Sequence, residues 1–351
     1  MSVAKFCRGV LLGGLLGDCF GAPFEAKPRV QLDVPIRMIK NTLSGLESSQ
    51  LTFTDDTDMA MGILNSISRL NRFVPSDVIK EFTTAYFTDG DGRFYGRSVQ
   101  ALFQQWKDSG YDDPYRLAAS QFGGSGSYAN GGAMRISPAS LYMLNQPDSD
   151  FVTFVIDVTR LTHTHPLAIY GALFQAMAVR QLWSVLTTEG QIDRTSFADL
   201  LVSKLGHIKH SEIDFNSSSC QEVFEKYKSK FECVNSLLQL DRDPPATEVV
   251  ERLGNDLQAL NSVPTAIYIF LRSLKPIPSI PFDSVLLRCL ACAISLGGDT
   301  DTIGTMACSL AGGYAILSDE PDPLPATMVS RCEQRERIEE YARWLTCTLS
   351  Q

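Results

Sequence analysis

The chain has 351 residues, of which 44% are hydrophobic, and a formal net charge of −9. The composition is ordinary for a globular protein with a substantial core, and the length allows one large domain or two. Because the chain is acidic and has no long block of Lys or Arg, we do not expect it to bind nucleic acid. An anionic small substrate is compatible with this charge if bound cations offset the carboxylates.

Apolar residues at helical spacing predict a helix over 6–16, close to the N-terminus. The segment Gly17–Glu25 contains two glycines and a proline, and we expect it to break this helix into a turn. Residues 26–53 look irregular, with Pro28, Pro35 and Gly45. A loop of that length in a compact protein is often functional.

The same N-terminal region imitates the core of a short signal peptide, because Lys5 and Arg8 precede the apolar residues 10–16. Its interleaved glycines and the lack of a convincing cleavage site argue against export, and no apolar stretch is long enough to span a membrane. We therefore expect an intracellular protein without a membrane segment. Its compartment stays open among the nucleus, the cytoplasm and the mitochondrial matrix.

Further along the chain, apolar periodicity predicts helices over 59–70, 74–86, 99–106, 151–161, 167–186, 249–274 and 285–296. We expect a turn at 89–96 and rigid connectors at 276–281 and 320–325, which are rich in proline. Residues 200–240 are the most polar part. No long run alternates at strand period and no hairpin signal joins two such runs, so the chain is predicted to be all-α.

The nine cysteines are odd in number and mostly embedded in apolar segments. They are typical of reduced, buried thiols in an intracellular protein. Cys289 and Cys292 have the spacing of half a zinc site. They lie in an apolar, helical run without a second such pair, so we expect no zinc there.

Two clusters of Thr and Asp stand at the mouths of apolar helical runs. Thr54–Asp58 is the first, and Asp299–Thr302, directly after two glycines, is the second. Such side chains cap helices well. They also supply the hard oxygen ligands that Mg²⁺, Mn²⁺ or Ca²⁺ requires. One cluster alone is explained equally well as a helix cap, and the repetition of the pattern favours a metal site.

Residues 121–135 contain five glycines, and successive amides in such a loop can bind an anion. The loop is neither a Walker A motif nor a dinucleotide fingerprint, and a flexible turn is the alternative. Phe122 and Tyr128 flank the glycines and can stack on a base or pack in the core. His163 can donate to a phosphate or play a structural role, whereas His207 and His210 are expected to be solvated.

In chain order, Gly17–Gly21, Thr54–Thr57, Gly126–Arg135, Leu161–His163 and Leu296–Thr302 resemble the motifs of the ADP-ribosylhydrolase family, which includes the dinitrogenase-reductase-activating glycohydrolases. The resemblance covers nearly the whole chain. It is greatest to the vertebrate branch that removes ADP-ribose from serine and cleaves poly(ADP-ribose). It implies a compact, single-domain, all-α orthogonal helical bundle over residues 1–351, with two Mg²⁺ ions, or Mn²⁺ as a substitute, in a cleft.

The resemblance also implies roles for individual residues. Glu25 would be catalytic and would reach the metal centre from a mobile flap. The metal ligands would be Glu25, Thr54, Asp55, Asp56, Asp299, Asp301 and Thr302, with Asp301 suited to bridging the ions. The substrate would contact Phe122, Ser125, Gly126, Ser127, Tyr128, Ala129, Asn130, Gly131, His163 and Leu257, with Phe122 and Tyr128 holding adenine. Ser125 departs from the lysine expected in the most similar relatives, and Ala129 from a glycine.

The implied activity is Mg²⁺-dependent hydrolysis of the O-glycosidic bond between ADP-ribose and protein serine, and of poly(ADP-ribose), with O-acetyl-ADP-ribose as a further substrate. Such an enzyme would reverse ADP-ribosylation after DNA damage and act as a monomer, without nucleic acid or membrane. Two alternatives stay open: a metal-dependent phosphohydrolase, and a non-catalytic ADP-ribose-binding module. Whether Glu25 is a general acid or a general base is also open.

Overall fold

The structure is a computed structural model, and it describes residues 2–90, 92–208, 217–318 and 320–350. Within these residues every regular element is a helix, and extended pairing is limited to two isolated bridges, Leu51 with Cys332 and Ala129 with Gln258. The prediction of an all-α fold is confirmed. The single-domain organisation over 1–351 stays a prediction.

The first half of the chain contains α1 (Val3–Gly21), η1 (Ala22–Phe24), α2 (Asp33–Leu43), α3 (Asp55–Leu70), α4 (Pro75–Asp89), α5 (Arg97–Asp108), α6 (Arg116–Ser120), η2 (Gln121–Gly124), α7 (Gly131–Met134), α8 (Ile136–Tyr142), α9 (Asp148–Arg160) and α10 (Pro166–Thr188). The second half contains α11 (Arg194–Gly206), α13 (Ser217–Leu238), α14 (Ala246–Leu253), α15 (Ala259–Ser273), α16 (Val285–Ser295), α17 (Thr300–Ala315), α18 (Ala326–Val329) and α19 (Arg335–Leu349).

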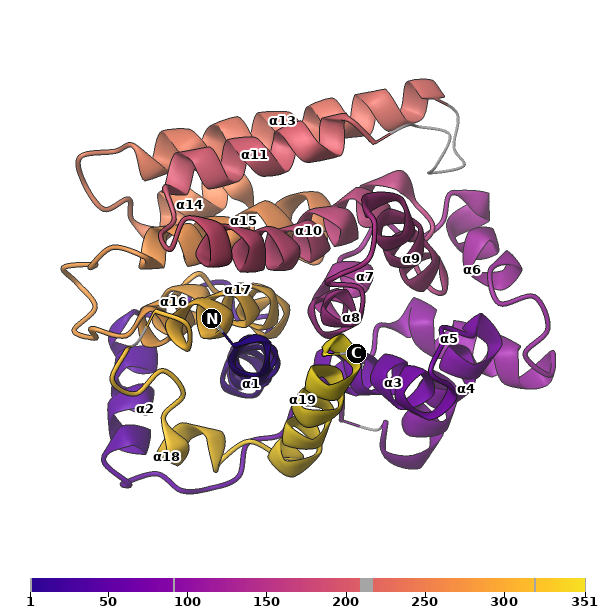
Figure 1. Ribbon diagram of the computed structural model, residues 1–351, viewed down its shortest axis with the longest axis horizontal. Helices are drawn as coiled ribbons and strands as arrows, with labels where there is room; N and C mark the ends of the chain where they lie inside the picture. The colour runs from indigo at the N-terminus through magenta and orange to yellow at the C-terminus, as the bar shows by residue number, and fades with distance from the viewer. Residues whose placement is uncertain (1, 91, 209–216, 319, 351) are drawn as a thin grey trace.

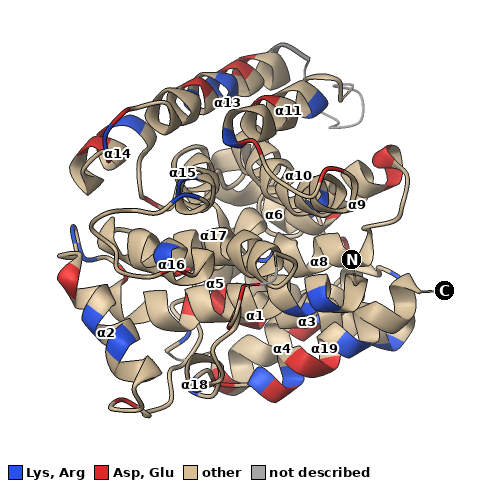
Figure 2. Cartoon of the chain, turned by 60° about the vertical axis from the view of Figure 1, so that its left-hand side comes forward, with Lys and Arg blue, Asp and Glu red and all other residues tan. Residues whose placement is uncertain are grey.

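Helices α1 and α17 pack against each other inside the core, with α16 beside α17 and α19 against α1 (Figure 1). On the other side of α17, helices α10 and α15 separate it from the pair α11 and α13 (Figure 1). Charged side chains gather on outer helices such as α2, α13 and α19, while α15 and α17 carry few (Figure 2). Apolar helices therefore form the centre and amphipathic ones the shell.

The α1–α17 contact is close because glycines face each other across it. A Cβ at Gly17 would lie 2.1 Å from the carbonyl oxygen of Gly304, and one at Gly13 would lie 2.1 Å from that of Cys308. The two backbones therefore touch, which only residues without a side chain allow. The turn expected over Gly17–Glu25 is wrong in its first part for this reason: α1 continues to Gly21, and its glycines serve helix packing. The chain leaves the α-helix only at η1.

Replacing Gly17 by alanine should therefore destabilise the protein. The added methyl group meets backbone that cannot move aside, and overpacking of this kind costs about 1–3 kcal/mol. Gly14 on the same helix is the matched control, because the nearest atom to its Cβ would be the Ser309 hydroxyl oxygen at 3.3 Å, with Thr305 at ordinary contact distance. Denaturant unfolding should show a lower midpoint for Gly17→Ala and a small change for Gly14→Ala. Equal midpoints would show that α1 does not need its close approach to Gly304.

The prediction that 26–53 is irregular is wrong in its central part, where α2 forms. Pro35 lies in the first turn of α2, where a proline fits because its missing N–H has no acceptor there. Pro35, Ile39 and Thr42 are buried on one face of the helix. Contact with α16 and α18 thus favours a helix that local sequence did not reveal.

The other predicted helices are confirmed as α3, α4, α5, α9, α10 and α16. The single helix predicted over 249–274 is wrong: α14 ends at Leu253, where Gly254 has a left-handed φ, and α15 begins at Ala259 with Pro264 inside it. The polar stretch forms much of α11 and α13; His207 is exposed, and His210 lies outside the described residues.

All nine cysteines are unpaired, six of them buried and one, Cys347, exposed. In the described parts of the chain, no helix is long and apolar enough to cross a membrane.

Candidate active site

A cavity of about 460 Å³ collects residues from segments that are far apart in the sequence. It receives Glu25, side chains of both Thr/Asp clusters and side chains of the Gly-rich loop. Its lining consists of Glu25, Asp55, Met59, Phe94, Gly96, Arg97, Ser98, Val99, Phe122, Ser127, Tyr128, Ala129, Asn130, Gly131, Met134, His163, Leu257, Asp299, Asp301 and Thr302.

The first cluster is held by a cap and by a buried carboxylate. The Thr54 hydroxyl accepts from the Asp56 N–H, so Thr54 caps α3, and it also donates to Asp56 Oδ2 at 3.1 Å. Asp18 of α1, fully buried, accepts from the N–H groups of Thr54 and Thr57 at 2.9 and 3.0 Å, and from the Thr57 hydroxyl. Asp18 therefore fixes the start of α3 and with it the direction of Asp55.

The second cluster reaches the first across the cavity. Asp299 stands at the N-cap of α17 but makes no cap bond, and its Oδ2 accepts from Asn130 Nδ2 at 2.6 Å. The Thr302 hydroxyl lies 3.3 Å from Asp56 Oδ2, across 246 residues of sequence. A helix cap therefore does not explain Asp299, whose carboxylate turns toward the Gly-rich loop.

Burial and mutual repulsion raise the pKa values of this carboxylate group. For Asp55, Asp56 and Asp301 desolvation is the main cause, followed by neighbouring carboxylates, and the pKa of each lies well above its usual value. The same burial raises the pKa of Asp299, against hydrogen bonds that lower it. A site with so much crowded negative charge is stabilised by cations.

Two further observations bear on metal binding. Asp56 Oδ1 and Asp301 Oδ1, one from each cluster, are buried without a hydrogen-bond partner among the described residues. In the same part of the chain, no three Asp, Glu, His or Cys side chains already surround one point as a closed metal site would. Because the set includes Thr hydroxyls and open carboxylate oxygens, its chemistry fits hard divalent cations.

Glu25 lies at the rim of this acidic floor, directly after η1. Burial, followed by the charges of Asp299 and Asp18, raises its pKa to about 7. The residues after Glu25 are hydrogen-bonded to Gly298, directly before the second cluster. The Ala26 N–H donates to the Gly298 carbonyl at 2.9 Å, and the Gly298 N–H donates to the Lys27 carbonyl at 2.7 Å. Ala26 has a left-handed φ of 60°. A non-glycine residue held in this unfavourable backbone conformation by its surroundings is frequent at functional sites.

The Gly-rich loop is joined to a distant segment by a short bridge. The Asn130 N–H donates to the Leu257 carbonyl at 2.9 Å, and the Ala259 N–H donates to the Tyr128 carbonyl at 3.3 Å. The Asn130 amide also donates to the Ser262 hydroxyl at 2.9 Å. These bonds bring Leu257 to the cavity, together with the other substrate contacts that the resemblance implied.

His163 is neutral in this arrangement. Burial, with a smaller contribution from Arg135, lowers its pKa to about 3. Arg135 donates to the Thr162 hydroxyl at 2.7 Å, and that hydroxyl lies 2.6 Å from His163 Nδ1. Arg135 and Thr162 thus hold the imidazole from its Nδ1 side and leave Nε2 toward Gly131. A side chain at Gly131 would come within 2.8 Å of Nε2, so a glycine is needed there.

The side chains predicted to hold adenine are not in the core. Phe122 is 59% exposed with a left-handed φ of 52°, and Tyr128 is 42% exposed with its ring edge-on to His165. Leu257 is 58% exposed beside them. Large apolar groups left open to a cavity in this way suit an aromatic ligand.

The structure does not bring every predicted residue to the cavity surface. Thr54 and Asp56 are buried beneath it, while Gly126 is buried against Thr164 and Ser125 is exposed, with its hydroxyl bonded to Phe122. Several lining residues had no predicted role: Met59, Phe94, Gly96, Arg97, Ser98, Val99 and Met134. Asp18 and Arg135 stand within the quoted motifs, which is the signal that could have found them.

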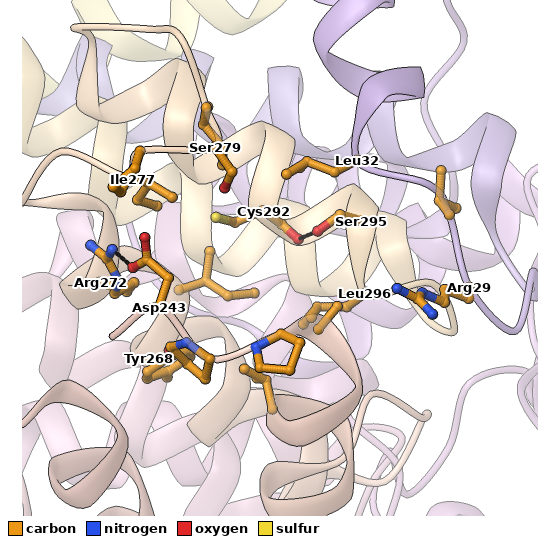
Figure 3. Close-up of a pocket in the computed structure, with 18 residues that line it drawn as sticks. Arg29, Leu32, Asp243, Tyr268, Arg272, Ile277, Ser279, Cys292, Ser295 and Leu296 are labelled. Atoms are coloured by element: carbon orange, nitrogen blue, oxygen red, sulfur yellow. Dashed lines mark hydrogen bonds and ion pairs between the residues drawn. The ribbon is translucent and has the colours of Figure 1, made fainter. Parts of the chain in front are cut away.

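A second cavity, of about 420 Å³, has a different character (Figure 3). Its walls are mainly apolar, with prolines and Tyr268, and its charged groups include the ion pair between Arg272 and Asp243 (Figure 3). It contains neither Thr/Asp cluster and none of the Gly-rich loop. Since the two volumes are similar, the chemistry of the lining distinguishes the active site from this cavity.

Comparison with known proteins agrees with this geometry. A model of the ADP-ribosylglycohydrolase family matches residues 2–350. The chain is 39% identical over 319 residues to ADP-ribosylhydrolase ARH3 of Xenopus tropicalis, covering 89% of this chain and 87% of that protein. It is 36% identical over 356 residues to ADP-ribosylhydrolase ARH3 of Homo sapiens, covering 98% and 93%. A solved structure of an ADP-ribosylglycohydrolase-related protein complex has the same fold, with a TM-score of 0.65, 18% identity and 99% coverage of both chains.

Proposed function

Because this chain belongs to the ADP-ribosylglycohydrolase family and is a glycohydrolase acting on ADP-ribose, we propose that it cleaves the O-glycosidic bond of ADP-ribose attached to protein serine, and that of poly(ADP-ribose). O-acetyl-ADP-ribose is a further proposed substrate. Similarity over almost the whole length to proteins named ADP-ribosylhydrolase ARH3 supports this choice.

The observation that carries the proposal is the meeting of two kinds of surface in one cavity. At the floor, Glu25 lies with the carboxylates of both Thr/Asp clusters. Above it, the Gly-rich loop, His163 and exposed aromatic rings form walls. The acidic floor suits a ribose with its hydroxyls, and the walls suit a diphosphate and a base.

The acidic and threonine side chains of the cavity fit divalent cations. We propose that they bind two Mg²⁺ ions, for which Mn²⁺ can substitute. Thr54, Asp55 and Asp56 would hold them from one side and Asp299, Asp301 and Thr302 from the other, with Glu25 in reach. The two buried oxygens without partners support this assignment. When bound, divalent cations supply Lewis-acid polarisation of ribose oxygens and offset the charge of the diphosphate.

The chain's own groups have the following proposed roles. Breaking the ribose C1″–O bond requires proton transfer at the departing oxygen or at the attacking water, and Glu25 is the group placed for it. A carboxyl with a pKa of about 7 exchanges its proton readily at neutral pH. His163 Nε2–H donates to a phosphate oxygen, while Arg135 and Thr162 hold the ring in place from its Nδ1 side.

Mass spectrometry of the products from a serine-ADP-ribosylated peptide, with and without Mg²⁺, tests the proposal. Release of intact ADP-ribose and of unmodified serine, only when Mg²⁺ is present, is the expected result. Release of inorganic phosphate from ADP-ribose would instead identify a phosphohydrolase. Binding without any product would identify a binding module.

Tyr128 provides a separate test of the adenine wall. Base–aromatic stacking is worth about 1–3 kcal/mol, so Tyr128→Ala should weaken ADP-ribose binding roughly 5- to 150-fold. Phe87 is the control, because it is 43% exposed on α4 and does not line the cavity. Calorimetry with ADP-ribose measures both variants. Unchanged affinity in a folded Tyr128→Ala variant would remove Tyr128 from the binding site.

For the setting of the enzyme we propose an intracellular monomer in the nucleus, the cytoplasm or the mitochondrial matrix, acting in the DNA-damage response. The net charge of −9 supports activity without nucleic-acid binding. Fractionation of cells that express a tagged chain, and light scattering of the purified protein, test these points.

A further inference from the structure

Residues 93–98 form a wall of the catalytic cavity to which the proposed chemistry gives no role. Phe94, Gly96, Arg97 and Ser98 line the cavity, on the turn before α5 and in its first residues. This turn is bound to the metal-ligand end, because the Asp55 N–H donates to the Arg93 carbonyl at 2.7 Å. The wall therefore stands beside the floor where the ribose bond would be cut.

Phe94 is held there in a conformation that its side chain disfavours. Its φ of 63° is left-handed, which is unfavourable for any residue with a Cβ, and its ring is 53% exposed. Both neighbours are fixed: Arg93 donates to both Glu333 carboxylate oxygens at 2.7 and 2.9 Å, and the Tyr95 hydroxyl donates to Asp58 at 2.7 Å. The surrounding structure thus presents a strained, exposed aromatic ring to the cavity.

The position of Arg97, like the conformation of Phe94, is not explained by a contribution to the stability of the fold. It is the first residue of α5, where a positive charge opposes the helix dipole. It is exposed and makes none of the ion pairs found among the described residues. Within the described lining it is the one Lys or Arg, in a cavity that also contains the carboxylates of Glu25, Asp55, Asp299 and Asp301. A cation in this place suits an anionic part of the substrate.

The exposed apolar side chains of the cavity fall into two groups, and Phe94 is separate from those of the Gly-rich loop. Seven large apolar side chains are exposed in the described chain, and four of them line this one cavity. Tyr128 and Leu257 belong to the two segments of the Gly-rich-loop bridge, and Phe122 stands at the start of that loop. Phe94 instead follows Arg93, whose carbonyl accepts from the Asp55 N–H. The cavity thus has two aromatic walls, one tied to the loop and one to the metal-ligand end.

We propose that Phe94, Arg97 and Ser98 bind the nucleotide unit on the far side of the scissile bond when the substrate is poly(ADP-ribose). The Phe94 ring stacks on its base, and the Arg97 guanidinium and the Ser98 hydroxyl bind its diphosphate. This inference rests on the proposed function. In the polymer the leaving group is a ribose hydroxyl of another ADP-ribose unit, which carries a base and two phosphates. A serine peptide carries neither, so this wall determines selectivity for the polymer.

The experiment compares kcat/KM for poly(ADP-ribose) with kcat/KM for a serine-ADP-ribosylated peptide, in the full chain with Mg²⁺. In Phe94→Ala the ratio of polymer to peptide should fall about 5- to 150-fold, the loss expected for one base–aromatic stack. Arg97→Ala should lower the same ratio, and the loss should shrink at high salt because exposed charges are screened. Calorimetry with ADP-ribose should give similar affinities for both variants and the wild type. Phe87→Ala, an exposed aromatic outside the cavity, should leave the ratio unchanged.

The variant Phe94→Gly removes the ring without destabilising the fold, so a loss of selectivity in it cannot be caused by unfolding. Because φ at position 94 is favourable for glycine, Phe94→Gly should unfold at a temperature no lower than the wild type and still lose polymer selectivity. An unchanged ratio in Phe94→Gly and Arg97→Ala would overturn the inference. So would an equal loss on polymer, peptide and ADP-ribose binding, because the wall would then belong to the ADP-ribose site itself. A wild-type chain that releases ADP-ribose from neither substrate would instead refute the proposed function.

Discussion

Asp301→Ala is expected to abolish hydrolysis of serine-linked ADP-ribose and to weaken Mg²⁺ binding. The Asp301 carboxylate is 2% exposed, and one of its oxygens has no partner among the described residues, so it is free to ligate a cation. A catalytic metal supplies several kcal/mol of transition-state stabilisation. Since each 1.36 kcal/mol is tenfold in rate, the loss should exceed about 10³-fold. Single-turnover assays and calorimetric Mg²⁺ titration measure the two effects.

The same variant also tests how Asp301 affects the stability of the protein without Mg²⁺. Asp299, Asp56 and Glu25 raise the pKa of Asp301 by repulsion, after burial, so removing it relieves crowded charge. Without Mg²⁺ the variant should therefore unfold at no lower denaturant concentration than the wild type. Asp241→Ala, at an exposed carboxylate after α13, serves as the control and should change neither activity nor Mg²⁺ binding. Full Mg²⁺-dependent activity in Asp301→Ala would exclude Asp301 from the site.

Glu25→Gln should separate chemistry from binding. Glutamine keeps the size of the side chain and a hydrogen-bonding oxygen, but it does not exchange a proton at neutral pH. General acid–base catalysis contributes roughly 10²–10⁴-fold, and the single-turnover rate should fall by that amount at saturating Mg²⁺. ADP-ribose affinity should change much less, because the base and the diphosphate contact other residues.

Glu47→Gln is a suitable control for Glu25, since Glu47 pairs with Arg331 away from the cavity. It should retain wild-type turnover. A near-wild-type rate in Glu25→Gln, measured on a serine-linked ADP-ribose peptide, would refute the catalytic role of Glu25. The proton would then have to move through another carboxyl group of the floor, and Asp299 would be the next residue to replace.

Local sequence accounts for much of the site because its key residues follow helix-start rules. Thr54 caps α3, and Asp299 precedes α17 after two glycines that both have positive φ. Apolar periodicity predicted α1, α3, α10 and α16 among others, because period and capping act within a few residues. The ordered motifs, read together, also indicated the family.

Other features were missed because their cause lies elsewhere in the chain. Gly17 and Gly21 look like helix breakers until α17 lies against them, and α2 is helical where local signals favoured a loop. The wall made by Phe94 and Arg97 has no motif. It reaches the cavity because Arg93 is bonded to Glu333, 240 residues away, and to Asp55.

By itself, the sequence determined that the chain is all-α, that two Thr/Asp clusters begin helices, and which family the ordered motifs resemble. These properties depend on neighbouring residues, which are already close in the unfolded chain. Only the tertiary structure decided that Thr302 meets Asp56, that Leu257 is bonded to Asn130, and that Thr162 links Arg135 to His163. Such contacts arise from the close packing of α1 with α17 and from long-range hydrogen bonds, whose partners no local pattern specifies.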